Sequence, residues 1–237
     1  MEIFWRLMFG HLLADFTFQT NFINRWKRTS MAGLLAHCLM HPLFYVILCW
    51  PYLGQTWIDN PFIHLNGWWC LLIVFVTHFL EDWWRVYTIF KYGMPDNTMF
   101  FIWDQIIHYS VIFAVAPMAM SAAASSGYFP EKWSVLGCVF VLATHATTVM
   151  VYFLEKDLHG AEFPGTDEKY LGMAERLVLA LVFLFPGPVG AAVLAAAWLG
   201  VMFLLRRRRV FDMSPFSFYA GAAMSVACGL AARAVYY

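Results

Sequence analysis

Long apolar stretches follow one another along the chain and are separated by short polar breaks. A helix needs about 20 mainly apolar residues to cross the hydrocarbon core of a bilayer, with roughly 17 to 25 as the working range. Of the 237 residues, 62% are hydrophobic and only 13% are charged, whereas soluble domains average about 25% charged. The pattern predicts an all-α polytopic membrane protein, and it excludes a disordered chain and a nucleic-acid-binding domain.

Eight transmembrane spans are predicted from these stretches, forming a single integral membrane domain. The expected spans cover residues 2–23, 31–53, 66–90, 98–122, 132–154, 171–187, 189–205 and 214–235. As one helix at ~1.5 Å per residue, 171–205 would be roughly 52 Å long, so we expect a break at Pro186-Gly187-Pro188. The helices in 1–122 are expected to carry the functional site, and those in 132–237 to support it.

The distribution of basic residues supports eight spans. Cytoplasmic loops of membrane proteins are enriched in Lys and Arg. With eight spans, the odd-numbered connections hold most of the bases, whereas the even-numbered connections hold only Lys132. A seven-span chain would move the run Arg206–Arg209 to the outer face. Both termini are therefore predicted to lie outside.

Four of the predicted spans carry ionisable side chains within the membrane, where such groups are costly and are functional candidates by default. Each of these spans holds a pair four residues apart, so both members project from one helix face. The pairs are His11 with Asp15, His37 with His41, His78 with Asp82, and Asp104 with His108. These residues are the predicted metal ligands.

The pairs also lie at matching depths, counted from the predicted cytoplasmic end of each span. One layer holds Gln19, His37, Asp82 and Asp104, and the layer one turn deeper holds Asp15, His41, His78 and His108. Structural pairing between helices is the alternative explanation, but it gives no reason for four helices to share one depth. The shared depth therefore favours a ligand or proton site.

The ligand types suggest which ion would bind. Mixed imidazole and carboxylate ligation suits a divalent ion such as zinc, manganese or iron, and the set is large enough for two ions. The five cysteines form no CxxC pair and are expected to be small core residues. An uncoordinated Glu81 or Asp104 is the expected catalytic base. Further residues are expected to orient ligands or substrate, or to join the site: Gln19, Gln105, His145, Glu175 and Arg176.

The same segments carry a family resemblance. His11-Leu12-Leu13-Ala14-Asp15-Phe16 with Gln19-Thr20, the later His and Asp pairs, Leu171-Gly172 with Glu175-Arg176, and 214–230 resemble a family of prokaryotic integral membrane proteins of unknown function. Arg85 stands where that family usually has Lys. The first motif is also similar to that of membrane-bound metal-dependent hydrolases. The resemblance implies a multi-pass protein of a prokaryotic cytoplasmic membrane.

Three functions remain open from the sequence. The first is a metal-dependent hydrolase whose site opens to the cytoplasmic half of the membrane and acts on a lipid or amphiphilic substrate. The second is a proton- or cation-coupled transporter or channel that uses the same side chains as a relay. The third is a haem- or partner-binding membrane subunit, which the carboxylates fit poorly. Membrane lipid is the expected partner in each case, and nucleic acid is not.

Overall fold

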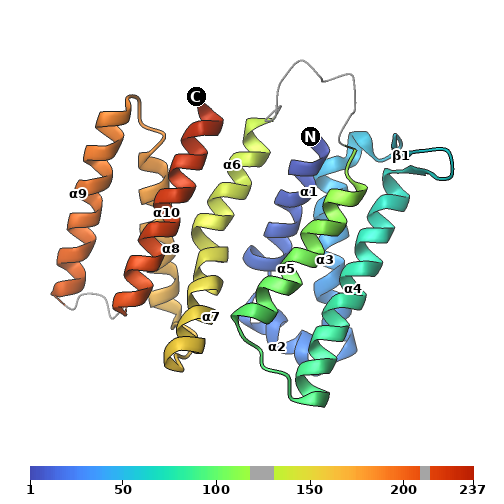
Figure 1. Ribbon diagram of the computed structural model, residues 1–237, viewed down its shortest axis with the longest axis horizontal. Helices are drawn as coiled ribbons and strands as arrows, with labels where there is room; N and C mark the ends of the chain where they lie inside the picture. The colour runs from blue at the N-terminus through green and yellow to red at the C-terminus, as the bar shows by residue number, and fades with distance from the viewer. Residues whose placement is uncertain (118–130, 209–213) are drawn as a thin grey trace. The chain divides into compact units, whose positions relative to one another are not determined.

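The computed structural model describes residues 1–117, 131–208 and 214–237 and is helical except for one short hairpin (Figure 1). The chain divides into two compact units, 1–134 and 135–237, and each is described by itself. The predicted break at 125–131 lies outside the described residues except for Glu131, and Arg209 lies outside them too.

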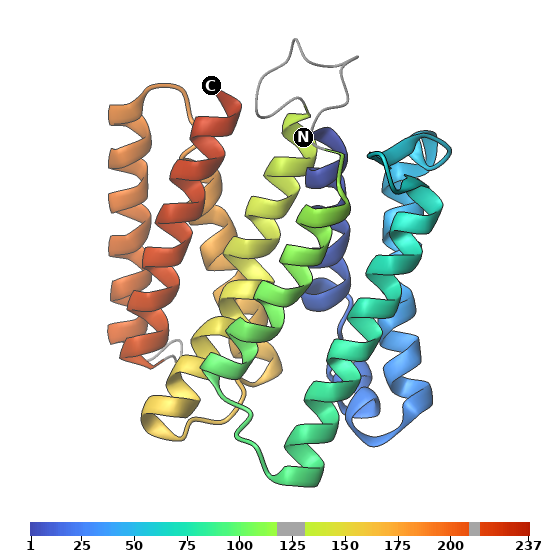
Figure 2. The same cartoon turned by 45° about the vertical axis from the view of Figure 1, so that its right-hand side comes forward.

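In unit 1 the elements follow in a simple order. They are α1 (Glu2–Leu12) with a π-helical turn (Leu13–Thr17), α2 (Asn21–Thr29), α3 (Met31–Cys49) with a 3-10 turn (Trp50–Tyr52), β1 (Thr56–Asp59), β2 (His64–Asn66), α4 (Gly67–Tyr92) and α5 (Thr98–Val115). Helix α1 packs on α3, α3 on α4, α4 on α5, and α5 on α1. These four helices therefore form a closed bundle, seen from a second side in Figure 2.

Short polar side chains begin the helices of unit 1. The side chains of Thr20, Ser30, Asn66 and Asn97 accept backbone N–H bonds at the first turns of α2, α3, α4 and α5. Such caps satisfy donors that have no partner within the helix. Gly93 ends α4 in the left-handed region at φ 65°, where glycine avoids the strain that a Cβ brings.

The structure corrects the predicted start of the chain. The first span was expected to cover 2–23 and to be followed by a break, but the helix of the first span ends at Thr17 and a separate helix, α2, covers Asn21–Thr29. Thr20 explains the new start, because its side chain accepts a bond from Ile23 N at 3.3 Å. Helix α2 has no buried residue, and Phe22 is 63% exposed.

Helix α2 lies against the start of α3 at a position that only glycine allows. A Cβ placed on Gly33 would lie 2.4 Å from the backbone carbon and oxygen of Trp26. Such a distance is far shorter than any real contact between these atoms. Gly33 therefore fixes how closely α2 approaches the bundle, which matters for the basic side chains that α2 carries.

The interior of unit 1 changes character along its length. At the end formed by the start of α1 and the end of α5, the interior is an apolar core that includes Leu7, Tyr45, Val74, Ile112 and Val115. The buried histidines and carboxylates lie beyond this core. The unit thus has one apolar half and one polar half.

A β-hairpin joins α3 to α4, within residues predicted only as a break. β1 and β2 pair antiparallel, with Thr56 opposite Asn66 and Asp59 opposite His64, and the register shifts between Thr56 and Ile58. His64 in β2 has a 69% exposed side chain that pairs with Asp59.

Unit 2 contains the remaining helices. They are α6 (Lys132–Val141, which begins in unit 1), a π-helical turn (Leu142–Ala146), α7 (Thr147–His159), α8 (Thr166–Val182), α9 (Pro188–Arg207) and α10 (Pro215–Tyr236). The predicted break at Pro186-Gly187-Pro188 is confirmed, since α8 and α9 are separate helices. Helix α8 packs on α10, and Gly229 lies against Phe183.

Within the described residues, five helical segments are long and apolar enough to cross a membrane. They are Met31–Tyr52, Thr98–Val115, Lys132–His159, Pro188–Arg207 and Pro215–Tyr236. These segments indicate a multi-pass membrane protein, as the composition predicts. The count of eight spans and the outside position of both termini stay predictions.

A buried histidine and carboxylate cluster in the four-helix bundle

The cluster begins at the π-helical turn of the first helix. Asp15 lies in this turn and is 7% exposed, and His11 lies one turn earlier and is fully buried. The distance from His11 Nε2 to Asp15 Oδ2 is 3.2 Å, so the predicted pair does share one face. Single π-helical turns inside α-helices occur frequently at functional sites, because they redirect side chains.

One oxygen of Asp15 faces histidines of α3 and α4. Asp15 Oδ1 lies 3.0 Å from His41 Nε2, 3.4 Å from His37 Nε2 and 4.0 Å from His78 Nε2. All four side chains are buried, and their ligand atoms lie within 4.8 Å of one another. This set could hold one metal ion.

The other oxygen of Asp15 faces a second set of histidines. Asp15 Oδ2 lies 3.2 Å from His11 Nε2 and 3.9 Å from His108 Nδ1. His11, His78 and His108 also form a group whose nitrogen atoms lie within 4.8 Å of one another. The His78 ring lies between the two sets, with its centroid 3.8 Å from that of His41 and 4.0 Å from that of His108.

Carboxylates of α4 and α5 extend the cluster toward α2. Glu81, Asp82, Asp104 and His108 form another buried group with converging ligand atoms. His37 Nε2 lies 3.1 Å from Asp82 Oδ2, and His108 Nε2 lies 3.1 Å from Glu81 Oε2. All eight predicted metal ligands therefore lie together in unit 1, and their roles as ligands and their common depth in a membrane stay predictions.

Many of these atoms make no hydrogen bond. His37 Nε2, His78 Nε2, both ring nitrogens of His108 and both Glu81 oxygens are buried and have no hydrogen-bond partner within the described residues. Some lie close to opposite charge, yet without hydrogen-bond geometry. Unpaired buried polar atoms cost about 1 to 3 kcal/mol each. A bound ion would offset this cost, because ligand atoms in a metal site point toward the ion and not toward one another.

One cysteine lies closer to the cluster than the sequence suggests. Cys38 Sγ lies 3.9 Å from Asp82 Oδ2, and Cys38, His78 and Asp82 form a further group that could hold an ion. Cys38 is fully buried, as expected of a small core residue, and it also lies within reach of the cluster. The reason is helical spacing: Cys38 follows His37 directly and lies three residues before His41.

The predicted orienting residues divide into three kinds. Gln105 lies in the cluster, where its Nε2 donates to Asp15 Oδ2 at 2.9 Å and to Asp104 Oδ2 at 3.1 Å. Gln19 Oε1 is buried, but it makes no hydrogen bond within the described residues. His145, Glu175 and Arg176 lie in unit 2, where Arg176 donates to the Thr148 hydroxyl and His145 Nδ1 lies 3.1 Å from Thr144 Oγ1.

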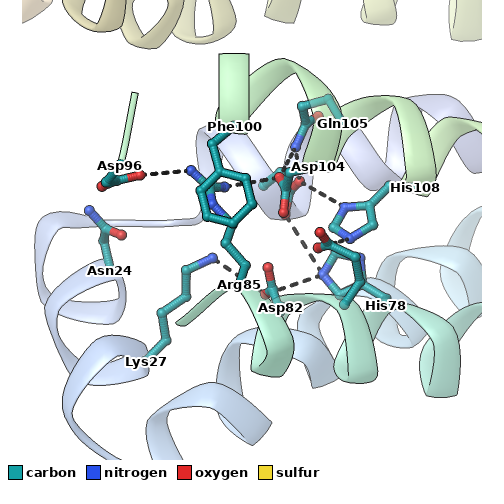
Figure 3. A network of polar contacts seen from close by, with 12 residues as sticks. Asn24, Lys27, His78, Asp82, Arg85, Asp96, Phe100, Asp104, Gln105 and His108 are labelled. Carbon is teal, nitrogen blue, oxygen red and sulfur yellow. Dashed lines mark hydrogen bonds and ion pairs between the residues drawn. The ribbon is translucent and has the colours of Figure 1, made fainter. Parts of the chain in front are cut away.

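Four charged residues join the cluster in a way that the sequence does not reveal. Lys27 Nζ lies 3.4 Å from Asp82 Oδ2, and Arg85 Nη1 lies 3.1 Å from Asp104 Oδ2 (Figure 3). Asp96 connects the two helices, because its oxygens accept from Arg28 at 2.8 Å and from Arg85 at 3.0 Å. Lys27 and Arg28 appear in the sequence only as loop charges, and Asp96 lies in a polar break.

Comparison with known proteins gives a family but no activity. The model of a family described as "Protein of unknown function (DUF3307)" matches residues 3–136. No curated protein and no solved structure matches the chain. The match covers more than half of the sequence and nearly coincides with unit 1, whereas the resemblance expected for 171–230 lies outside it. The chain belongs to this family of proteins of unknown function, DUF3307, whose matched region contains the whole histidine and carboxylate cluster.

Proposed function

We propose that this protein is a metal-dependent hydrolase of a prokaryotic cytoplasmic membrane, with its site in the cytoplasmic half of unit 1. The observation that carries the proposal is the convergence of buried imidazole nitrogens and carboxylate oxygens, many of which have no hydrogen-bond partner within the described residues. Its substrate is a lipid or another amphiphile. The ion is zinc, manganese or iron, in keeping with mixed nitrogen and oxygen ligands.

The spacing of the ligand atoms supports an ion at Asp15. In a tetrahedral zinc site with bonds of about 2.0 to 2.1 Å, neighbouring ligand atoms lie roughly 3.3 Å apart. Asp15 Oδ1 lies between 3.0 and 4.0 Å from the Nε2 atoms of His37, His41 and His78. Small side-chain rotations bring these atoms to the distances that a bound ion requires.

The charge of the cluster supports an ion as well. The network contains five carboxylates and three cationic side chains, which leaves two negative charges when the histidines are neutral. Its members are Asp15, Glu81, Asp82, Asp96 and Asp104 with Lys27, Arg28 and Arg85. Uncompensated charge is costly in a low-dielectric interior. One divalent ion balances this excess.

A second ion is supported by the two oxygens of Asp15. They face different histidine sets, Oδ1 toward His41 and Oδ2 toward His11. Asp15 could therefore offer a ligand atom to each of two ions, the number that many hydrolytic sites use. His78, which lies between both sets, is available to either ion.

Glu81 is the better candidate for the general base. When bound, the metal supplies a Lewis acid that activates water for attack. Within the described residues, neither Glu81 oxygen has a hydrogen-bond partner, and Glu81 Oε2 lies 3.1 Å from His108 Nε2. Asp104, the other predicted base, is held by Arg85 at 3.1 Å and by Gln105 at 3.1 Å. Asp104 is thus already engaged by two partners, so Glu81 takes the proton.

The surroundings of the cluster favour hydrolysis over transport. One turn from His11, His41, His78 and His108, the bundle interior is filled by Leu7, Tyr45, Val74 and Ile112. This apolar layer offers no ion path toward the predicted outer face within the described residues. A pocket lined by Val74, Ile107 and Val111 reaches His11, His78 and His108.

Elemental analysis of detergent-purified protein tests the proposal. The protein should hold one or two divalent ions per chain, and the double variant His37→Ala, His78→Ala should lose most of them. His64→Ala is the matched control, since His64 is exposed in the hairpin and outside the cluster. A protein without stoichiometric metal, and with the same metal content in the double variant, would overturn the hydrolase. Hydrolysis of fatty acyl nitrophenyl esters in mixed micelles and cation flux in liposomes then separate catalysis from transport.

A further inference from the structure

The basic side chains at the α2 end of unit 1 surround a single carboxylate. Arg28 of α2 and Arg85 of α4 both donate to Asp96, one to each oxygen, at 2.8 and 3.0 Å. The three side chains are 30%, 12% and 13% exposed, respectively. Two guanidinium groups that converge on one carboxylate form the arrangement that proteins use for oxyanions with several acceptor oxygens.

Asp96 occupies this position from a segment without regular structure. Residues 93–97 link α4 to α5, and Gly93, Met94 and Pro95 are exposed. Asp96 directly precedes Asn97, the N-cap of the 18-residue helix α5. Helix N-termini favour negative charge. The position therefore attracts an anion for two independent reasons.

Arg85 connects this anion position to the cluster. Its Nη2 donates to Asp96, while its Nη1 lies 3.1 Å from Asp104 (Figure 3). Lys27, the neighbour of Arg28 on α2, lies 3.4 Å from Asp82. A divalent ion bound by Asp82 and Asp104 would share the negative charge that now neutralises Lys27 and Arg85. When metal is bound, the positive charges of Lys27 and Arg85 are therefore less neutralised, and they are available to bind another anion.

We propose that Arg28 and Arg85, with Lys27 beside them, bind the phosphate group of the substrate, and that Asp96 occupies this position when substrate is absent. The inference rests on the proposed hydrolase and specifies its substrate class as a phosphate-bearing amphiphile. Phosphate carries more charge than a carboxylate and a third acceptor oxygen, so it displaces Asp96. Phe22, on the same helix as Lys27 and Arg28, is 63% exposed, in keeping with a site at the depth of lipid headgroups.

Phosphate binding to zinc-loaded, detergent-purified protein tests this site. Asp96→Asn should bind radiolabelled inorganic phosphate about tenfold more tightly, because the competing charge is gone and the neighbouring helix cap remains. Arg28→Gln should weaken binding about tenfold or more. Arg25→Gln is the matched control, because Arg25 carries the same charge on the same helix but is exposed. Equal phosphate affinity in the wild-type, Asp96→Asn and Arg28→Gln proteins would overturn the phosphate site.

Two further arms identify the source of the phosphate and separate this inference from the hydrolase. Nanodiscs that contain phosphatidic acid should displace labelled phosphate from the protein, and nanodiscs of phosphatidylcholine alone should not. If only free phosphate displaces the label, the inference that the substrate is an amphiphile is wrong. If the protein binds metal but no phosphate, the proposed phosphate site is wrong, and the proposal of a metal-dependent hydrolase is unaffected. If the protein binds no divalent metal but still binds phosphate in a way that depends on Arg28, the anion site is supported and the proposal of a metal-dependent hydrolase is wrong.

Discussion

The Oδ1 atom of Asp15 lies 3.0 Å from Nε2 of His41, although the two residues belong to different helices and are separated by α2. This contact joins the first helix to the rest of the cluster. The second oxygen of Asp15 faces His11, so the loss of one carboxylate affects both histidine sets.

Asp15→Asn should remove more metal than any other single substitution. An amide binds a divalent ion far more weakly than a carboxylate, and even substitutions beyond the ligands cost about 10- to 100-fold in metal affinity. We expect a loss of more than about 100-fold, measured by competition with a chromogenic chelator. Asp59→Asn removes the same charge from the exposed hairpin and should leave metal affinity unchanged. Equal metal affinity in both variants would exclude Asp15 as a ligand.

Glu81→Gln should separate metal binding from catalysis. The amide keeps the shape of the side chain but cannot accept a proton, and loss of a general base costs about 10²- to 10⁴-fold in rate. We expect kcat to fall by this factor while elemental analysis finds nearly normal metal content. Glu162→Gln, in the exposed link between α7 and α8, is the control. A kcat that stays within twofold of the wild-type value would remove Glu81 from the role of base.

Gly33→Ala should displace α2. The added Cβ would lie 2.4 Å from the Trp26 backbone, and such overpacking costs about 1 to 3 kcal/mol. We expect a lower free energy of unfolding in detergent and, because Lys27 moves with α2, weaker phosphate binding. Gly200→Ala introduces the same methyl group in α9 with no atom within 4 Å, so it should not destabilise the protein. Equal stabilities of the two variants would contradict the close approach of α2.

Removal of metal should lower the melting temperature. A ligand that binds only the folded state stabilises it by about 2.7 kcal/mol at a concentration 100 times its Kd. The protein should therefore melt at a lower temperature with chelator than with zinc, as followed by loss of helical circular dichroism. The double variant His37→Ala, His78→Ala provides the control, since it should melt at the same temperature in both conditions. A wild-type protein that shows no difference would argue against an ion in the cluster.

Much of unit 1 was predictable because membrane helices obey simple periodic rules. Apolar runs placed α3 and α4 within a few residues of their observed bounds, and the spacing of His37 and His41 put both on one buried face. Residues could also be counted from the predicted cytoplasmic end of each span, so residues distant in sequence were expected at the same depth in the membrane. Asp15, His41, His78 and His108 do lie together in unit 1.

The sequence alone could not reveal the shape of the first helix. A π-helical turn follows the same apolar pattern as an α-helix, so the turn at Leu13–Thr17 left no sign that separates the two. Helix α2 was hidden for a related reason, because its polar and basic residues match a loop as well as an amphipathic helix. Its position depends on Gly33 and the Trp26 backbone, a contact between two segments.

The sequence by itself therefore determined the class of the protein, the approximate helices of unit 1 and the residues that meet in its bundle, because each follows from local periodicity and from the cost of charge in a membrane. Only the tertiary structure decided which oxygen of Asp15 faces which histidine, and that Asp96 lies between Arg28 and Arg85. Such contacts depend on helix rotation and on the paths of connecting segments. Both are set by the packing of whole helices, which no local pattern specifies.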